Sequence, residues 1–335
     1  MFAFGFWPRA NCRRVGVGGR AGWRRRPAVR AWGVILVCAV ASGMFCGTAA
    51  TCGATRDSNQ KSMQQAIDAV PFDKLNVQAQ GKLWDVMSKP SLYRQLPVTV
   101  IQSDPDLYLT MIRHPEIVVN MWQLMGVTRV TMQRTGDFTL DAADGAGTVC
   151  NVELVYGDRN THVFYSEGTY EGKLLRNLIR GRCVMVLQSE YKSTEDQRVY
   201  VTSRLDMFVQ FDNVGAEILA KTLHPLVGKS ADHNFTESTK FLGQVASAAE
   251  RKTVGLQRLS QRLNNVDVAI REKFTSATAT AHQRAALRDS GKKIWEADLT
   301  SAVQPAPVVT TQRGQQGATN LLRTAPQGKT ISLRH

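Results

Sequence analysis

An alternation of apolar and polar residues from Thr128 to Phe211 constrains the fold of this chain more than any other feature. Successive side chains of a strand point to opposite faces of a sheet, so a period of two predicts strands with one buried face. The run 198–211 shows the pattern most clearly. Turn residues at 144–145 and 157–160 predict hairpins between the runs. We therefore expect about six antiparallel strands in this region, with a helical turn or a loop over residues 173–179.

Helical patterns precede these strands. The run 58–89 carries an irregular apolar stripe of the kind found on a packed helix. A short extended run, 97–101, is followed by Ser103-Asp104-Pro105, which combines a capping side chain with proline in a first helical turn. We expect helices over 105–113 and 116–125.

Helical patterns return after the strands. Apolar residues between 218 and 226 indicate a helix that breaks near His224-Pro225. Asn234 and Glu237 have the spacing of a capping pair and predict the start of another helix. Apolar residues from 256 to 270 then repeat at 3-4-3-4 spacing over about two heptads. This repeat predicts either a helix packed on its own domain or a weak contact between two copies of the chain.

The summed order is one strand, two helices, about six antiparallel strands and a long C-terminal helix. Between roughly Leu96 and Ala249, this order resembles the helix-grip fold of the START and Bet v 1-like proteins. The resemblance implies an α+β fold in which a curved antiparallel sheet of about six or seven strands wraps the C-terminal helix around an apolar cavity. The segments HPEIVVNMWQLMG (114–126) and LHPLVGKSADHNF (223–235) also resemble uncharacterised exported proteins of planctomycete-type bacteria, a likeness that implies no activity.

The apolar strand faces have two interpretations. Ordinarily they form a packed core, whereas in a helix-grip fold they line a ligand cavity. The candidate lining residues are Val152, Leu154, Phe164, Met185, Leu187, Leu205, Met207 and Phe211, together with Ile218 and Leu219 from the following helix. Glu167 and Arg204 are polar candidates that would orient a head group. Which strand face is concave depends on the register and stays open at this stage.

The N-terminus predicts export. Eight arginines and no acidic residue precede the apolar run Ala31–Phe45, which is the pattern of a secretory signal. The alternative is an uncleaved anchor through residues 31–55, but a membrane-spanning helix needs about 20 apolar residues, and this run is shorter. We expect a periplasmic or other extracytoplasmic protein. The chain then divides into five parts: a signal or anchor (1–54), a helical lead-in (55–95), a helix-grip-like domain (96–250), a helical extension (251–300) and a disordered tail (301–335).

The charge distribution argues against nucleic-acid binding. The formal net charge is +14, but residues 1–56 hold nine basic and no acidic residues, and 301–335 hold four basic and none acidic. The remaining 57–300 hold 29 basic and 28 acidic residues. A nucleic-acid module needs a basic face to displace counterions from phosphates, so we expect no nucleic-acid partner.

The cysteines and histidines are the remaining candidates for chemistry. Cys150 and Cys183 lie in predicted strands, where they form either a disulfide or two separate small apolar residues. His114, His224 and His233 are weak candidates for a metal or proton-transfer site. Their spacing does not force them together, and roles in capping and loops are the simpler interpretation. We expect no cofactor, no bound metal and no catalytic residue.

These observations favour an exported, non-catalytic binding protein for a lipid or another hydrophobic small molecule. The first alternative is a structural protein of the cell envelope that assembles through the helices at 58–89 and 256–270. The second alternative is a hydrolase or cyclase that depends on His114, His224 or His233.

Overall fold

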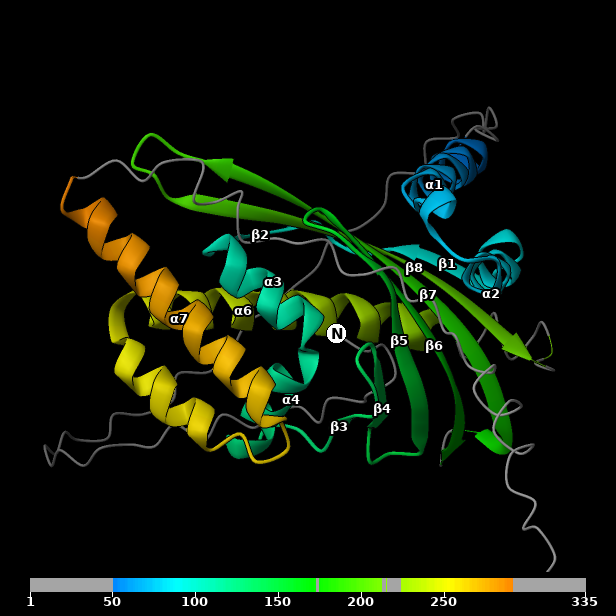
Figure 1. The fold of residues 1–335 in the computed structure, drawn as a ribbon. Coiled ribbons are helices and arrows are strands. Elements are labelled where there is room, and N and C mark those ends of the chain that lie inside the picture. Colours follow the sequence, from blue (N-terminus) through cyan, green and yellow to red (C-terminus); the bar gives the residue numbers. More distant parts are fainter. Residues whose placement is uncertain (1–50, 173–174, 213–214, 216–223, 292–335) are drawn as a thin grey trace, which may run out of the picture.

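The computed structural model describes residues 51–172, 175–212, 215 and 224–291 (Figure 1). The predicted signal at 1–50, the predicted tail at 301–335 and the cavity candidates Ile218 and Leu219 lie outside these described residues. Within them, no helix is both long and apolar enough to cross a membrane.

Eight strands form one curved antiparallel sheet (Figure 1). The strand order is β1-β8-β7-β6-β5-β4-β3, and β2 also pairs with β8. Strands β3 to β8 are the predicted antiparallel strands, six in number, and each pairs with the next along the chain. The bounds are β1 Leu92–Gln95, β2 Thr99–Gln102, β3 Thr131–Arg134, β4 Thr139–Ala143, β5 Thr148–Gly157, β6 Thr161–Gly172, β7 Leu175–Ser193 and β8 Val199–Asp212.

The helices lie before β1, between β2 and β3, and after β8. Their bounds are α1 Thr51–Asp68, α2 Val77–Ser88, α3 Pro105–Arg113, α4 Pro115–Leu124, α6 His224–Gln261 and α7 Val268–Asp289, with a short 3-10 helix at Phe72–Lys74. This order confirms the α+β fold class that the helix-grip resemblance implied.

The start of α3 shows how local chemistry sets an element boundary. One carboxylate oxygen of Asp104 accepts hydrogen bonds from the backbone N–H groups of Asp106 at 3.0 Å and Leu107 at 3.1 Å. Pro105 occupies the first turn, where its missing N–H costs nothing. Pro115 begins α4 in the same way, directly after α3 ends. The two predicted helices are therefore confirmed.

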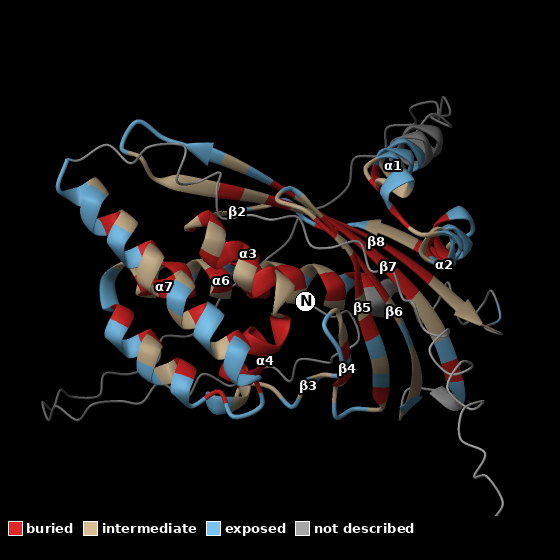
Figure 2. Ribbon diagram, in the orientation of Figure 1, coloured by how far each residue is buried: buried red, intermediate tan, exposed pale blue. Residues whose placement is uncertain are grey.

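The sheet separates two apolar cores. On its concave face, strands β4 to β8 pack against α3, α4 and α6, and the buried side chains form one continuous cluster (Figure 2). On the convex face, α1 and α2 cover a second cluster, which includes Phe208, Val184 and Val163 of the sheet and Leu83 of α2. The predicted lead-in helix is thus two helices that are packed on the outside of the sheet.

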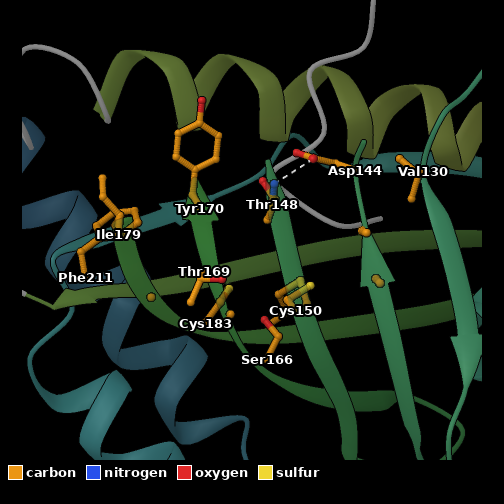
Figure 3. Close-up of a pocket in the computed structure, with 15 residues that line it drawn as sticks. Val130, Asp144, Thr148, Cys150, Ser166, Thr169, Tyr170, Ile179, Cys183 and Phe211 are labelled. Carbon is orange, nitrogen blue, oxygen red and sulfur yellow. Dashed lines mark hydrogen bonds between the residues drawn. The ribbon is translucent and has the colours of Figure 1, made fainter. Parts of the chain in front are cut away.

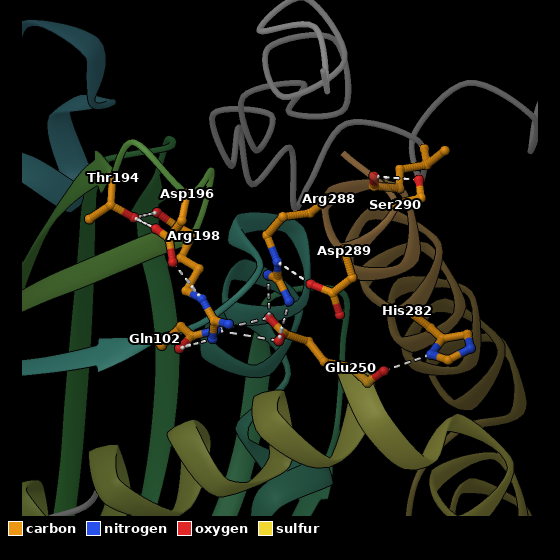
Figure 4. Close-up of polar contacts among 10 residues, drawn as sticks. Gln102, Thr194, Asp196, Arg198, Glu250, His282, Arg288, Asp289 and Ser290 are labelled. Carbon is orange, nitrogen blue, oxygen red and sulfur yellow. Dashed lines mark hydrogen bonds and ion pairs between the residues drawn. The ribbon is translucent and has the colours of Figure 1, made fainter. Parts of the chain in front are cut away.

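Polar contacts dock α7 beside α6. One carboxylate oxygen of Glu250, on α6, accepts a hydrogen bond from Arg288 of α7 at 3.1 Å (Figure 4). Both carboxylate oxygens also lie 3.3 Å from the side-chain nitrogen of Gln102 at the end of β2. The backbone oxygen of Glu250 lies 2.7 Å from Nδ1 of His282. The helical extension is therefore held against the sheet domain by side chains from three elements.

Two local predictions around the sheet and α6 are wrong. The first concerns the segment 173–179, for which we expect a helical turn or a loop. From Leu175 onward this segment is instead part of β7, and Leu175 pairs with Gly172 of β6. The capping pair Asn234 and Glu237 does not begin a helix, because α6 already starts at His224 and passes through both residues. Ala231 before Asn234 and Phe235 after it are both buried on the packed face of α6, so the helix continues through this point.

The repeat at 256–270 is not one helix. Helix α6 ends at Gln261, and α7 begins after Asp267, whose side chain caps it. Most of the repeating apolar residues are nevertheless buried in the concave core, namely Leu256, Leu263, Val266 and Ile270, and Leu259 packs against it partly buried. Their spacing reflects a helix-turn-helix that is packed on its own domain, which is the first of the two alternatives.

Candidate ligand-binding site

A pocket opens on the concave face near one end of the sheet (Figure 3). Strands β4 to β8 supply nearly all of its wall. The lining residues are Val130, Ala142, Ala143, Asp144, Thr148, Cys150, Ser166, Gly168, Thr169, Tyr170, Ile179, Gly181, Cys183, Met185 and Phe211.

The pocket exists because small residues lie side by side across four strands. Ala142 of β4 pairs with Cys150 of β5, Cys150 pairs with Gly168 of β6, and Gly168 pairs with Gly181 of β7. This small-residue row (Ala142, Cys150, Gly168 and Gly181) ends at Phe211 of β8, which pairs with Gly181. Paired residues of neighbouring strands point to the same face. The row therefore leaves a hollow where larger side chains would fill the concave face.

The size of the hollow limits what it can hold. About 70 Å³ is open to the centre of a water molecule. One water needs about 10–15 Å³ by this measure, so the space corresponds to roughly five waters. That is room for a single aromatic ring or an alkyl segment of about five or six carbons. The pocket is smaller than the sites of about 300–1,000 Å³ that enclose whole drug-sized ligands.

Both cysteines line the pocket as free thiols. Burial and then the nearby carboxylate of Asp144 raise the pKa of the Cys150 thiol to about 11. Burial raises the pKa of the Cys183 thiol to about 12. Because the thiolate is the reactive form of cysteine, both groups are poor nucleophiles near neutral pH. In the pocket they behave as small apolar side chains.

The edge of the pocket at the β4–β5 hairpin is polar. One carboxylate oxygen of Asp144 accepts hydrogen bonds from the N–H groups of Ala146 at 2.7 Å and Thr148 at 2.9 Å. The other carboxylate oxygen is buried and has no hydrogen-bond partner among the described residues, and the same holds for the hydroxyl of Thr148. A buried oxygen without a partner costs about 1–3 kcal/mol. Both atoms belong to residues that line the pocket.

The structure places the described apolar cavity candidates in two groups. Met185 and Phe211 line the pocket. The second group lies on the same concave face but is packed in the core against α3, α4 and α6; it comprises Val152, Leu154, Phe164, Leu187, Leu205 and Met207. The middle of the concave face is thus filled, and the hollow lies toward one end.

The two predicted head-group residues lie on the convex face. A carboxylate oxygen of Glu167 accepts a hydrogen bond from the hydroxyl of Tyr165, which belongs to the convex cluster. Arg204 donates to Asp206 at 3.0 Å, and Asp206 also accepts from Tyr93 at 2.7 Å. Register alone decides this, because neighbouring positions along a strand face opposite sides of the sheet.

The small-residue row and Asp144 are functional candidates that the sequence did not reveal. Ala, Cys and Gly within a strand pattern read as weak strand positions, and glycine in a strand often marks close backbone approach. Only the register of the strands shows that the four small residues lie side by side across the sheet.

Of the three candidate histidines, His114 lies between α3 and α4, whereas His224 and His233 both belong to α6. Nδ1 of His114 is 3.7 Å from a carboxylate oxygen of Glu116 and 3.2 Å from Arg134. His233 is exposed on α6, and His224 begins that helix. Nowhere in residues 51–172, 175–212, 215 and 224–291 do three His, Cys, Asp or Glu side chains gather closely enough to hold a metal ion.

Comparison with known proteins finds similar folds only. No family model matches the chain, and no curated protein matches it. A conserved protein from Geobacillus kaustophilus is similar over 47% of this chain and 97% of its own, at 8% identity and a TM-score of 0.33. Truncated norcoclaurine synthase from Thalictrum flavum is similar over 46% and 93%, at 10% identity and a TM-score of 0.29. The di-domain ARO/CYC BexL is similar over 68% and 60%, at 12% identity and a TM-score of 0.24. At such values the likenesses say nothing about activity.

Proposed function

We propose that this protein is an exported, non-catalytic binding protein that holds a small hydrophobic molecule, or the apolar end of a lipid, in the concave pocket. The observation that carries the proposal is the small-residue row, which leaves a hollow between the apolar side chains of Ile179, Met185 and Phe211. The pocket volume sets the size of the bound group at one ring or about six carbons.

The environment of the pocket supports binding over the two alternatives. The enzymatic alternative depends on His114, His224 or His233, and none of these is among the described residues that line the pocket. The segments that would mediate assembly are used within the chain. Helices α1 and α2 cover the convex face, and four apolar residues of the repeat, Leu256, Leu263, Val266 and Ile270, are buried in the concave core.

Methyl NMR tests the proposal at the pocket itself. Toluene and 1-hexanol, added to protein labelled at the Ile δ1 and Met ε methyl groups, should shift the signals of Ile179 and Met185. The signal of Met63, which packs on the convex face, should not move. If neither pocket methyl responds to any of these probes, the proposal fails.

A filled pocket provides the matched comparison. Cys150→Leu adds two non-hydrogen atoms to the side chain in the small-residue row and should weaken probe binding at least tenfold. Val149→Leu changes the neighbouring exposed residue on the other face of β5 and should leave binding unchanged. Equal binding by both variants would place the probe elsewhere. Native mass spectrometry of protein purified from its own host would reveal a natural ligand. Sequencing the N-terminus of the same protein would test export.

A further inference from the structure

The polar edge of the pocket limits the chemistry of the ligand beyond its size. The Asx turn at the β4–β5 hairpin uses only one carboxylate oxygen of Asp144. The second oxygen and the Thr148 hydroxyl are buried without a hydrogen-bond partner in the part of the chain that the structure describes. Thr148 as a whole is only 7% exposed. The carboxylate oxygen accepts hydrogen bonds and the hydroxyl accepts or donates one, so a donor on a ligand satisfies either atom. Both residues line the pocket.

The charges around the pocket favour a donor on the ligand. An ionised carboxylate can only accept hydrogen bonds. No lysine, arginine or histidine is among the described residues that line the pocket, so no lining group supplies a positive charge to the ligand. The negative charge of Asp141 also acts on Cys150. A ligand carboxylate would therefore meet like charge with no counter-ion among the described residues that line the pocket.

Resting on the proposed function, we infer that the pocket selects a small amphiphile whose head group donates a hydrogen bond, a hydroxyl or an ammonium, and rejects carboxylates. The apolar part lies over the small-residue row, and the head group lies at Asp144 and Thr148. The site thus favours alcohols and amines over free fatty acids.

A series of ligands with one ring and different head groups tests the inference by calorimetry and methyl NMR. Benzyl alcohol and benzylammonium supply the two kinds of donor, toluene supplies none, and benzoate supplies a negative charge. At least one donor ligand should bind tenfold or more tightly than toluene, and benzoate should bind more weakly than toluene. The ratio between benzyl alcohol and benzylammonium distinguishes recognition of a hydroxyl from recognition of a cation.

Two variants assign the effect to the polar edge. Asp144→Asn keeps one oxygen for the turn and places an amide donor where the free carboxylate oxygen lies. It should abolish the preference for benzylammonium over toluene and raise the affinity for benzoate. Thr148→Val removes the hydroxyl at nearly constant shape and should reduce the preference for benzyl alcohol. Circular dichroism and the binding of toluene show whether each variant is folded with an intact pocket.

The outcomes separate this inference from the proposed function. If toluene, the donors and benzoate bind equally, or if benzoate binds most tightly, the head-group inference is overturned and the apolar pocket stands. An unchanged preference in both variants also overturns it. If no compound of the series binds, toluene included, the proposed function itself fails.

Discussion

Gly168 of β6 and Gly181 of β7 form a register pair in the lining of the concave pocket. Neither residue has a side chain, so the sheet is hollow at this point. The two glycines differ in how closely their neighbours approach. A Cβ atom at Gly168 would lie 2.4 Å from the backbone oxygen of Val149 and 2.5 Å from Cβ of Cys150. A Cβ atom at Gly181 would lie 3.3 Å from the ring of Phe211.

The two glycines should therefore respond differently to alanine. Gly168→Ala forces the backbones of β5 and β6 apart and should lower the free energy of unfolding by about 1–3 kcal/mol. Gly181→Ala needs only a small movement of the Phe211 ring and should cost less than about 1 kcal/mol, because alanine also restricts the unfolded chain. Urea unfolding of both variants measures the difference. Equal losses would contradict the close approach of β5 and β6 at Gly168.

Cys150 and Cys183 should remain free thiols under oxidising conditions. They lie on β5 and β7, with β6 between them. Neighbouring strands are about 4.8 Å apart, so two strand spacings exceed the Cα separation of about 4.4–6.8 Å that a disulfide requires. Differential alkylation followed by peptide mapping should find both residues unlinked after exposure to oxidised glutathione. A cross-linked peptide that contains both would mean that β6 can leave the sheet.

His162 should make the fold sensitive to acid. Its ring is buried, Nε2 accepts from Arg113 at 3.3 Å, and Nδ1 has no partner among the described residues. Burial and the Arg113 charge lower the pKa of His162 to about 3. Between pH 6.5 and this value the unfolded chain binds a proton that the folded chain does not. Stability due to this group is therefore complete above pH 6.5 and falls as the pH falls.

The acid effect has a measurable size. Between pH 7 and pH 5, His162 should lower the free energy of unfolding by about 2 kcal/mol. His162→Gln keeps an acceptor for Arg113 but does not titrate, so this variant should lose that part of the pH dependence. His233→Gln alters an exposed histidine and serves as the control. Identical pH profiles for wild type and His162→Gln would show that His162 titrates normally in the fold.

Arg284 should be needed to hold α7 against α3. Its guanidinium lies 2.9 Å from a carboxylate oxygen of Asp104 and 2.7 Å from one of Asp106, and it is 15% exposed. Arg284→Ala leaves two neighbouring carboxylates without this cation and should destabilise the protein by about 2–3 kcal/mol. Thermal unfolding and hydrogen exchange in α7 measure the effect. The control is Lys273→Ala, which changes an exposed residue on the same helix and should alter the free energy of unfolding by no more than about 0.5 kcal/mol. A similar loss of stability in both variants would contradict a specific role for Arg284.

The order of elements could be predicted because its signals are local. Alternation over 128–211 gives strands, and Asp104 with Pro105 marks the start of α3 through contacts within one turn. The errors arose where packing overrides a local signal. Asn234 and Glu237 have capping spacing, yet they lie inside α6 because its buried face continues on both sides of them.

The sequence by itself determined that a sheet of antiparallel strands lies between helices, because periodicity and caps act between residues a few positions apart. Only the tertiary structure decided where that sheet is hollow. The row from Ala142 to Gly181 depends on the register of four strands, and a shift of one residue in any strand would turn its small residue to the other face. For the same reason, Glu167 and Arg204 point away from the pocket, while Asp144 lies at its edge.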